Sequence, residues 1–330
     1  MNLLLTSLWR GVYSAAEWEK VGDDGENNSP CRKHAPVMLD EVLQGLGVFP
    51  GAVILDCTVG YCGHAERILE VSAPHGVVIG IDRDLQAIES DPRRASRFGS
   101  RLQLVHGQFM DLKRHLSDRG ISEVHGVLFD LGVSSPQLDE PSRGFSFQTQ
   151  GPLDMRMDQT RGRTAADILS CTDETDLADM IFRYGEERYS RRIARSIVRT
   201  RQSRPILTTG ELVSAVDRAV PNHYRRGRIH PATRTFQALR IAVNQELEHL
   251  ETSLRDATDM LAPGGRLCVI SFHSLEDRIV KRTFRSLSAT KLDILTKKPQ
   301  LPAREEARRN PRSRSAKLRI AQRRAQEIAA

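Results

Sequence analysis

The stretch VILDCTVGYCGHA at residues 53–65 decides the fold. It opens with a short apolar run that ends in Asp56, and a turn containing Gly60 and Gly63 follows at once. A second apolar run, 77–82, ends in Asp82, which lies 19 residues after Gly63. In open α/β sheets such a turn brings backbone close to a nucleoside, while the acid accepts hydrogen bonds from ribose hydroxyls. The stretch therefore predicts a parallel sheet with a nucleoside site at its carboxyl edge.

Further apolar runs extend this sheet. Residues 102–105 and 127–130 are short, aliphatic and spaced by about 20 residues from their neighbours, which indicates helical crossovers between strands buried on both faces. A helix is predicted over 41–46, and a fifth strand over 267–272 after a Pro-Gly-Gly turn. Before this turn, apolar residues recur every three or four positions over 236–261 and predict one amphipathic helix.

The fourth and fifth strands are more than a hundred residues apart, which is far more than one crossover requires. The intervening sequence has helical signals: Thr208 and Glu211 form a capping-box pattern, and Ile193 and Ile197 lie one turn apart. The predicted fold class is α/β, a doubly wound Rossmann-like sheet built from residues 32–137 and 231–330, with a mostly helical insertion over 138–230.

Composition limits the class of protein. The 330 residues hold 49 Lys and Arg against 42 Asp and Glu, and 39% are apolar, which excludes a collagen-like or wholly disordered chain. No apolar run approaches the roughly 18 residues of a membrane span. Five cysteines without a C-x-x-C pair argue against a zinc site and a disulfide framework, so no metal and a cytoplasmic location are expected.

Residues 1–31 are interpreted as a flexible extension or a misassigned start. Their apolar beginning is followed by five acids within residues 17–26, unlike a secretory signal or a mitochondrial presequence. A targeting role remains the alternative.

The glycine-bearing turn favours one class of nucleoside. On the dinucleotide pattern G-x-G-x-x-G/A, positions 60, 62 and 65 are Gly, Cys and Ala, so the glycine that admits a pyrophosphate is missing. S-adenosylmethionine has no phosphate, and the turn favours it over NAD. The alternative is an ordinary βα turn beside a strand-end acid.

Several long motifs share one resemblance. They read DLGVSSPQLD at 130–139, RGFSF at 143–147, GPLDMRMD at 151–158, YGEE at 184–187, HPATRTFQALRI at 230–241, SFHSLEDR at 271–278 and NPRSRSAKLR at 310–319. In this order they resemble the RsmH (MraW) family of bacterial methyltransferases, which use S-adenosylmethionine to methylate N4 of a cytidine in small-subunit (16S) ribosomal RNA near the decoding centre. The resemblance covers about residues 33–320 and implies a class I methyltransferase sheet with a substrate-binding helical insertion.

The resemblance also assigns residues. It places the cofactor contacts on Cys62, Gly63, His64, Asp82, Phe109, Asp130 and Gln137. The family usually has glycine at position 62 and serine at position 65. If position 62 needs a positive φ, Cys62 is strained where glycine is not, which affects cofactor affinity rather than the fold.

The implied reaction moves a methyl group in line from a sulfonium to an exocyclic amine, so positioning matters most. Asp130 is expected to orient the cofactor or the amine, with Ser134 and Ser135 lining the cytosine site; alternatively Asp130 only caps its turn. His273 is expected to contact the base or transfer a proton; alternatively it holds its loop through Glu276 or Asp277. Phe109 either stacks on adenine or belongs to the core.

Arginine clusters indicate an RNA partner. Residues 183–204 hold eight Arg against two Glu, residues 222–240 hold five Arg and two His without an acid, and residues 304–324 hold nine basic against two acidic residues. Such patches attract phosphates without reading sequence. We expect small-subunit ribosomal RNA or the small subunit itself as partner, a base taken out of its stack, and no membrane. Monomer and homodimer both stay open. Two rivals are a methyltransferase for protein or small molecules and a non-catalytic cofactor-binding assembly factor, the second suggested by Cys62.

Overall fold

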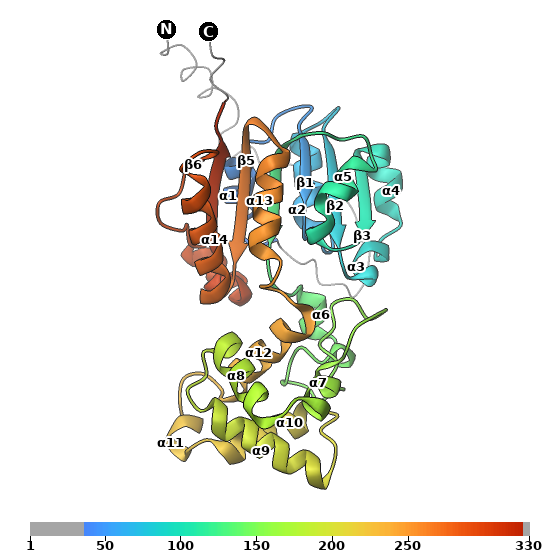
Figure 1. Cartoon of the computed structure of the whole chain (residues 1–330). Helices are drawn as coiled ribbons and strands as arrows, with labels where there is room; N and C mark the ends of the chain where they lie inside the picture. The colour runs from blue at the N-terminus through green and yellow to red at the C-terminus, as the bar shows by residue number, and fades with distance from the viewer. Residues whose placement is uncertain (1–35, 326–330) are drawn as a thin grey trace. The chain divides into compact units, whose positions relative to one another are not determined.

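The computed structural model describes residues 36–325, so the predicted extension over 1–31 lies outside it. In this range seven strands form one sheet in the order β3-β2-β1-β4-β5-β7-β6 (Figure 1). Neighbours from β3 through β5 pair in parallel, and β7 is antiparallel to both β5 and β6. The strands are β1 Val53–Asp56, β2 Val77–Asp82, β3 Leu102–His106, β4 Val124–Asp130, β5 Leu261–Ser271, β6 Leu292–Ile294 and β7 Lys317–Arg323. The predicted doubly wound α/β class is confirmed.

The strand order reverses between β1 and β4, which is where a doubly wound sheet opens a crevice for a ligand. Asp56 of β1 lies opposite Leu128 of β4, and Asp130 lies opposite Ile270 of β5. The acids that end β1, β2 and β4 therefore meet at one edge of the sheet.

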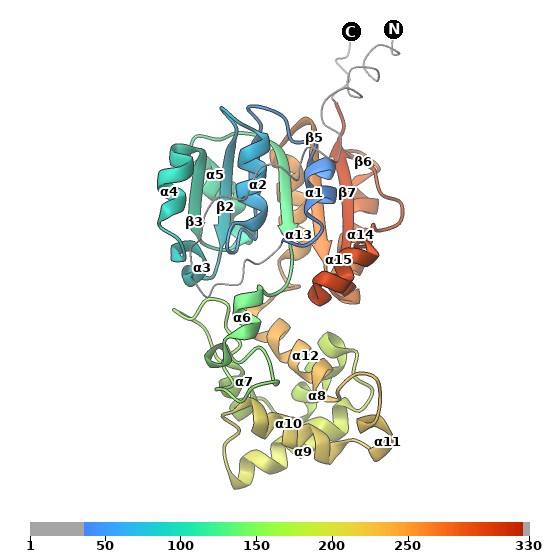
Figure 2. The ribbon, with the colours of Figure 1, turned by 180° about the vertical axis from the view of Figure 1, so that it is seen from behind.

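Helices cover both faces of the sheet (Figures 1 and 2). On one face, α5 (Leu112–Ser117), α13 (Leu250–Met260) and α14 (Ser274–Leu287) share a buried apolar core with the strands. On the other, α1 (Leu39–Leu46) and α2 (Gly63–Val71) share a second core. This double burial explains why the predicted strands are continuous apolar runs rather than alternating ones. Two short helices, α3 (Leu85–Glu89) and α4 (Arg93–Phe98), lie between β2 and β3.

Helices between β4 and β5 form a third core of their own. Thr208 accepts a hydrogen bond from the Glu211 N–H (3.3 Å) and donates its own N–H to that carboxylate (3.1 Å), so the predicted capping box is confirmed. Ile193 and Ile197 are fully buried in this core. The helices are α6 Ser135–Asp139, α7 Ala165–Cys171, α8 Glu174–Gly185, α9 Ser190–Ser203, α10 Thr209–Ala219, α11 Asn222–Arg225 and α12 Ala232–Asn244. Since α12 packs in this core, the helical packing continues past residue 230, where the sequence placed its end.

The single helix predicted over 236–261 is wrong. The chain breaks after α12, and Gln245 adopts a left-handed φ of 51° before α13 begins at Leu250. The Asn244 side chain holds the break: it accepts the Met157 N–H (2.8 Å) and donates to the Met155 carbonyl (2.8 Å). Apolar residues on the two helices happen to remain in phase, so their periodicity does not reveal the break.

The predicted fifth strand is present as β5, whereas β6 and β7 were not predicted. β5 begins at Leu261 rather than 267, because the Pro-Gly-Gly turn forms an irregularity within the strand, with Gly264 at a φ of 81°. Residues 317–320 alternate between charged and apolar side chains, a short signal that identifies the start of β7 in hindsight. A short helix, α15 (Arg304–Arg309), precedes this strand. Among the helices of residues 36–325, none combines the length and apolar character that a bilayer span requires.

Candidate active site

Three carboxyl groups end neighbouring strands at the sheet edge. Asp56 is 1% exposed, and burial raises its pKa to about 7, helped by the nearby Asp82. Burial also raises the pKa of Asp82, and raises that of Asp130 well above its ordinary value, with Asp56 adding to the effect. Buried like charges favour the protonated form unless a cation is present. The edge is therefore suited to a positively charged ligand.

The glycine-bearing turn after β1 and the acid that ends β2, Asp82, are in direct contact. Asp82 accepts the Gly60 N–H on Oδ2 (2.8 Å) and the Asp84 N–H on Oδ1 (2.8 Å). Gly60 has a left-handed φ of 48°, a conformation that glycine adopts without strain. The glycine turn of β1 is thereby held against the end of β2.

Cys62 has the positive φ that was considered in the sequence analysis, a conformation strained for any residue other than glycine. Its φ is 65°, its side chain is fully buried, and it starts α2 without a capping hydrogen bond. Burial raises the pKa of the thiol to about 12, so Cys62 is neutral at physiological pH. At Gly63 an added Cβ would lie 3.3 Å from the Pro36 side chain, which explains why this position is small.

One carboxylate oxygen of Asp130 accepts no hydrogen bond from any residue of 36–325. Its backbone N–H donates to the Thr58 hydroxyl (2.6 Å), and its Oδ2 lies 3.7 Å from Nδ1 of His64. The other ring nitrogen of His64 lies 3.0 Å from the Val37 carbonyl, which fixes the ring. The buried Oδ1 of Asp130 has no hydrogen-bond partner within the described residues. Since a buried polar atom without a partner is unfavourable, this oxygen is available to a ligand.

Gln137 and Ser134 are linked through the start of α6. Ser134 caps this helix, because the Gln137 side chain accepts the Ser134 N–H (2.9 Å) and the Ser134 hydroxyl accepts the Gln137 N–H (3.4 Å). Gln137 also donates to Oδ2 of Asp84 (2.7 Å). Gln137 thus contacts the loop that follows Asp82 directly, through Asp84. Its neighbour Ser135, half-buried, is the first residue of the helix.

Arg143 is a residue that sequence reasoning missed. Its guanidinium is 1% exposed, lies 2.8 Å from Oδ2 of Asp84 and donates to the Met157 carbonyl (3.0 Å). A buried arginine must be paired to be tolerated, and here the pair joins the loop after β2 to the segment leading into the helical core. Only its position in the RGFSF motif marked it in the sequence.

Phe109 lies in the core beneath the edge. Its ring meets Phe129 edge to face at 5.6 Å, and the guanidinium of Arg83 lies 5.6 Å from its centroid. With 9% of its surface exposed, it belongs to the core and still reaches the surface. The two predicted roles for Phe109 are therefore compatible.

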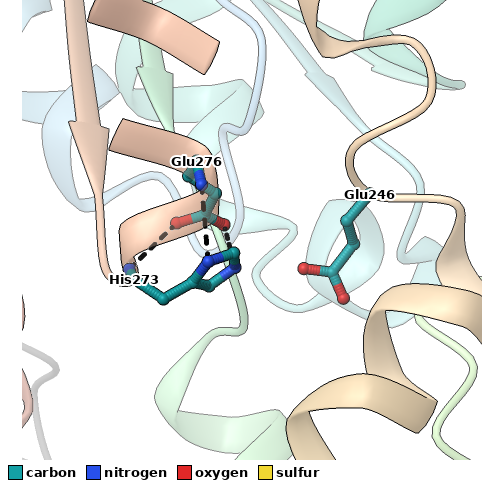
Figure 3. Close-up of side chains that lie close together, drawn as sticks. All are labelled: Glu246, His273 and Glu276. Carbon is teal, nitrogen blue, oxygen red and sulfur yellow. Dashed lines mark hydrogen bonds and ion pairs between the residues drawn. The ribbon is translucent and has the colours of Figure 1, made fainter. Parts of the chain in front are cut away.

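His273 lies in a second cluster with Glu246 and Glu276 (Figure 3), and the Glu276 carboxylate of this cluster is close enough to Asp130 to help raise its pKa. Nδ1 of His273 accepts the Glu276 N–H (3.4 Å) and so caps α14. Nε2 lies 3.2 Å from Oε1 of Glu276, so Glu276 contacts both ring nitrogens of His273. The loop-holding contact expected with Glu276 is present, whereas Asp277 pairs with Arg319 at 2.7 Å instead.

Arg240 neutralises this second cluster. It binds both carboxylate oxygens of Glu246, each at 2.8 Å, and Glu246 and Glu276 raise its pKa against the effect of burial. Burial would raise the pKa of Glu276, but hydrogen bonding to His273 and attraction to His273 and Arg240 hold it below its ordinary value. Although the three side chains have atoms within 4.8 Å of one another, as metal ligands would, their carboxylates already serve Arg240 and backbone amides. The cluster is best described as an ion-pair network that positions His273.

Comparisons with known proteins identify the family of the chain. The model of the MraW methylase family matches residues 31–324. A protein of Dehalococcoides mccartyi named ribosomal RNA small subunit methyltransferase H is 51% identical over 306 residues, covering 88% of this chain and 86% of that protein. Proteins of the same name from Synechococcus elongatus and Syntrophotalea carbinolica are 52% and 48% identical, each over 88% of this chain and over 94% and 98% of their own lengths. The chain belongs to the MraW methylase family.

Proposed function

We propose that this chain is an S-adenosylmethionine-dependent methyltransferase that methylates the N4 amine of a cytidine in small-subunit ribosomal RNA. The observation that carries the proposal is the set of three carboxyls that end neighbouring strands, with Oδ1 of Asp130 left without a partner among residues 36–325, in a member of a methylase family. The relatives described above carry names that state ribosomal RNA of the small subunit.

The site fits this donor by charge. S-adenosylmethionine carries a sulfonium and an ammonium, and bound cations favour the ionised form of nearby carboxyls. Burial raises the pKa of Asp56, Asp82 and Asp130. A bound cation would therefore stabilise the ionised form of each of these carboxyls. When bound, the donor supplies a methyl group already activated for displacement.

The chain's own residues position the two reactants. Asp82 and the Gly60 turn would hold the ribose end, and Cys62, Gly63, His64, Phe109 and Gln137 complete the proposed cofactor contacts. Asp130 would accept a hydrogen bond from the cytosine amine or from the donor, keeping the amine lone pair directed at the methyl group. His273, whose ring is fixed by Glu276, would contact the base. Ser134 and Ser135 would line the cytosine site.

The RNA partner follows from charge and from the relatives. We propose that residues 138–230, together with α12, contact RNA away from the target base, while the sheet holds the donor. A cytoplasmic location, where small subunits assemble, accompanies this substrate.

The non-catalytic alternative is not favoured. It was suggested by the departure at Cys62, but the turn with Cys62 in its left-handed conformation still donates the Gly60 N–H to Asp82. The substitution therefore leaves the shape of the turn intact.

Methyl transfer tests the proposal. The full chain is incubated with radiolabelled S-adenosylmethionine and either small subunits or naked small-subunit RNA from a strain lacking the gene, and the labelled nucleoside is identified by mass spectrometry. We expect label in N4-methylcytidine. Donor binding without transfer would support the assembly-factor alternative, and label in protein would support a protein methyltransferase.

A further inference from the structure

Five arginines converge on one concavity between α9 and α10. The concavity has a volume of about 650 Å³ and is lined by Arg192, Arg195, Arg199, Arg204 and Arg218 with intervening hydroxyl residues. We call it the α9–α10 groove. None of its residues belongs to the sheet edge described above.

The two helices build the groove with fixed geometry. Ile193 and Ile197 are buried on the inner face of α9, so Arg192, Arg195 and Arg199, spaced by three and four residues, share an outer face. The Ser196 hydroxyl donates to the Ala215 carbonyl of α10 (2.7 Å). From the other side, the Arg218 guanidinium donates to the Thr200 hydroxyl (3.0 Å). These two hydrogen bonds fix α9 against α10 at Ser196 and Thr200, and the arginine guanidinium groups surround these hydroxyl residues.

The positive charge of the groove is largely unneutralised. Arg195 pairs with Glu174 at 3.2 Å, but both side chains are well exposed, so water screens the pair. Among residues 36–325, neither the Arg199 nor the Arg204 side chain has a hydrogen-bond or ion-pair partner, although Arg204 is close enough to Glu211 to help lower the pKa of that carboxyl. No acidic residue lines the groove. Five like charges in one concavity repel one another, and an anion relieves that repulsion.

We propose that the α9–α10 groove binds the phosphate backbone of the substrate RNA, an inference that rests on the proposed function. Guanidinium forks match pairs of phosphate oxygens, and hydroxyls on the floor add neutral donors. No aromatic side chain lines the groove on which a base would stack, so it holds backbone and reads no sequence. Its role is to supply affinity and register while the base is bound elsewhere.

A matched pair of variants tests the groove. Arg199→Gln/Arg204→Gln removes two unpaired charges from it. Arg282→Gln/Arg285→Gln removes the same charge from the exposed face of α14, where neither side chain has a partner within the described residues. Binding of full-length protein to a fluorescent small-subunit RNA fragment is measured by anisotropy between 50 and 200 mM salt, beside calorimetric titration with S-adenosylmethionine.

Each lost phosphate contact should lower the salt slope by about 0.7–0.9. The groove variant should therefore have a slope smaller by about 1.4–1.8, so that the wild type loses about 7- to 12-fold more affinity than the variant over that fourfold salt range. Its KM for RNA should rise while kcat at saturating RNA and donor affinity stay unchanged. The α14 variant should match the wild type.

Equal slopes for the two variants would overturn the inference, as would a groove variant that loses donor affinity or kcat rather than RNA affinity. Unchanged RNA binding with weakened binding to vesicles of anionic lipid would also overturn it, in favour of a membrane surface. A wild type that binds RNA but transfers no methyl group would refute the proposed function and leave the groove standing.

Discussion

Replacing Asp56 with asparagine should make the donor-free protein more stable at high pH. The Asp56 carboxyl is 1% exposed and its Oδ1 accepts the Thr58 N–H at 3.1 Å. Asparagine keeps an acceptor of the same shape at that position but cannot ionise. The variant therefore isolates the effect of burying a negative charge at the end of β1.

The size of the effect follows from the pKa. Burial raises the pKa of Asp56 from 3.8 to about 7, so the folded state holds the proton more tightly than the unfolded state does. Stability from this group is complete below the unfolded pKa and is lost as pH rises through the folded one. Linkage then predicts that this carboxyl alone lowers the free energy of unfolding by about 2.5 kcal/mol between pH 5 and pH 8. Removing the Asp56 charge also eases ionisation of Asp130, which acts in the same direction.

Urea unfolding of the wild type and Asp56→Asn at pH 5, 6, 7 and 8 measures this difference. The stability of the variant relative to the wild type should rise by about 2–3 kcal/mol across the series. Asp118→Asn, at an exposed position after α5, is the control and should run parallel to the wild type. Parallel plots of unfolding free energy against pH for Asp56→Asn and the wild type would refute the interpretation that burial destabilises the ionised carboxyls at the sheet edge.

Three further predictions concern the same edge. Asp130→Asn should retain the fold but lower kcat for methyl transfer about 100-fold or more, and a near-normal turnover number would remove Asp130 from the reaction. Cys62→Gly should be more stable than Cys62→Ala by about 1 kcal/mol in urea unfolding, because both lose the thiol and only glycine relieves the positive φ; equal stabilities would contradict the strain at Cys62. Arg143→Met should lose about 3–5 kcal/mol by leaving Asp84 buried and unpaired, and the added change Asp84→Asn should restore part of that loss, whereas a silent Arg143→Met would contradict the buried pair.

The sheet was predictable because its signals are local. Buried parallel strands must be continuous apolar runs, and the runs ending in Asp56, Asp82 and Asp130 all became strands with those acids at one edge. The capping box at Thr208 and Glu211 was equally local, since both partners lie within one helical turn. The positive φ at Cys62 followed from the place where a pattern normally has glycine.

What the sequence did not reveal depends on contacts between distant residues. The break after Asn244 is held by hydrogen bonds to residues 155 and 157, nearly ninety positions earlier. The pairing of Arg143 with Asp84 spans 59 positions, and the ion pairs of Arg240 and Glu276 depend on where α12 and α14 meet. Periodicity and motif spacing carry no information about such partners.

The predicted site residues belong to two adjacent clusters, which are coupled through Asp130 and Glu276. The strand-end acids surround the glycine turn, whereas His273 belongs to the network of Glu276, Glu246 and Arg240. Motif order could place both at the carboxyl edge, but it could not show that Arg240 neutralises the second cluster. Likewise, the arginine count over 183–204 indicated RNA, but only the packing of α9 against α10 showed which of these residues share a groove.

The most direct test of the account is a crystal structure of the chain with S-adenosylmethionine, paired with a methyl-transfer assay on the same preparation. The account predicts the donor across the ends of β1, β2 and β4, with its ribose hydroxyls on Asp82, its sulfonium near Asp130 and its chain against the turn at 60–64. An active preparation whose crystals show the donor bound elsewhere, with this edge closed by side chains, would contradict it.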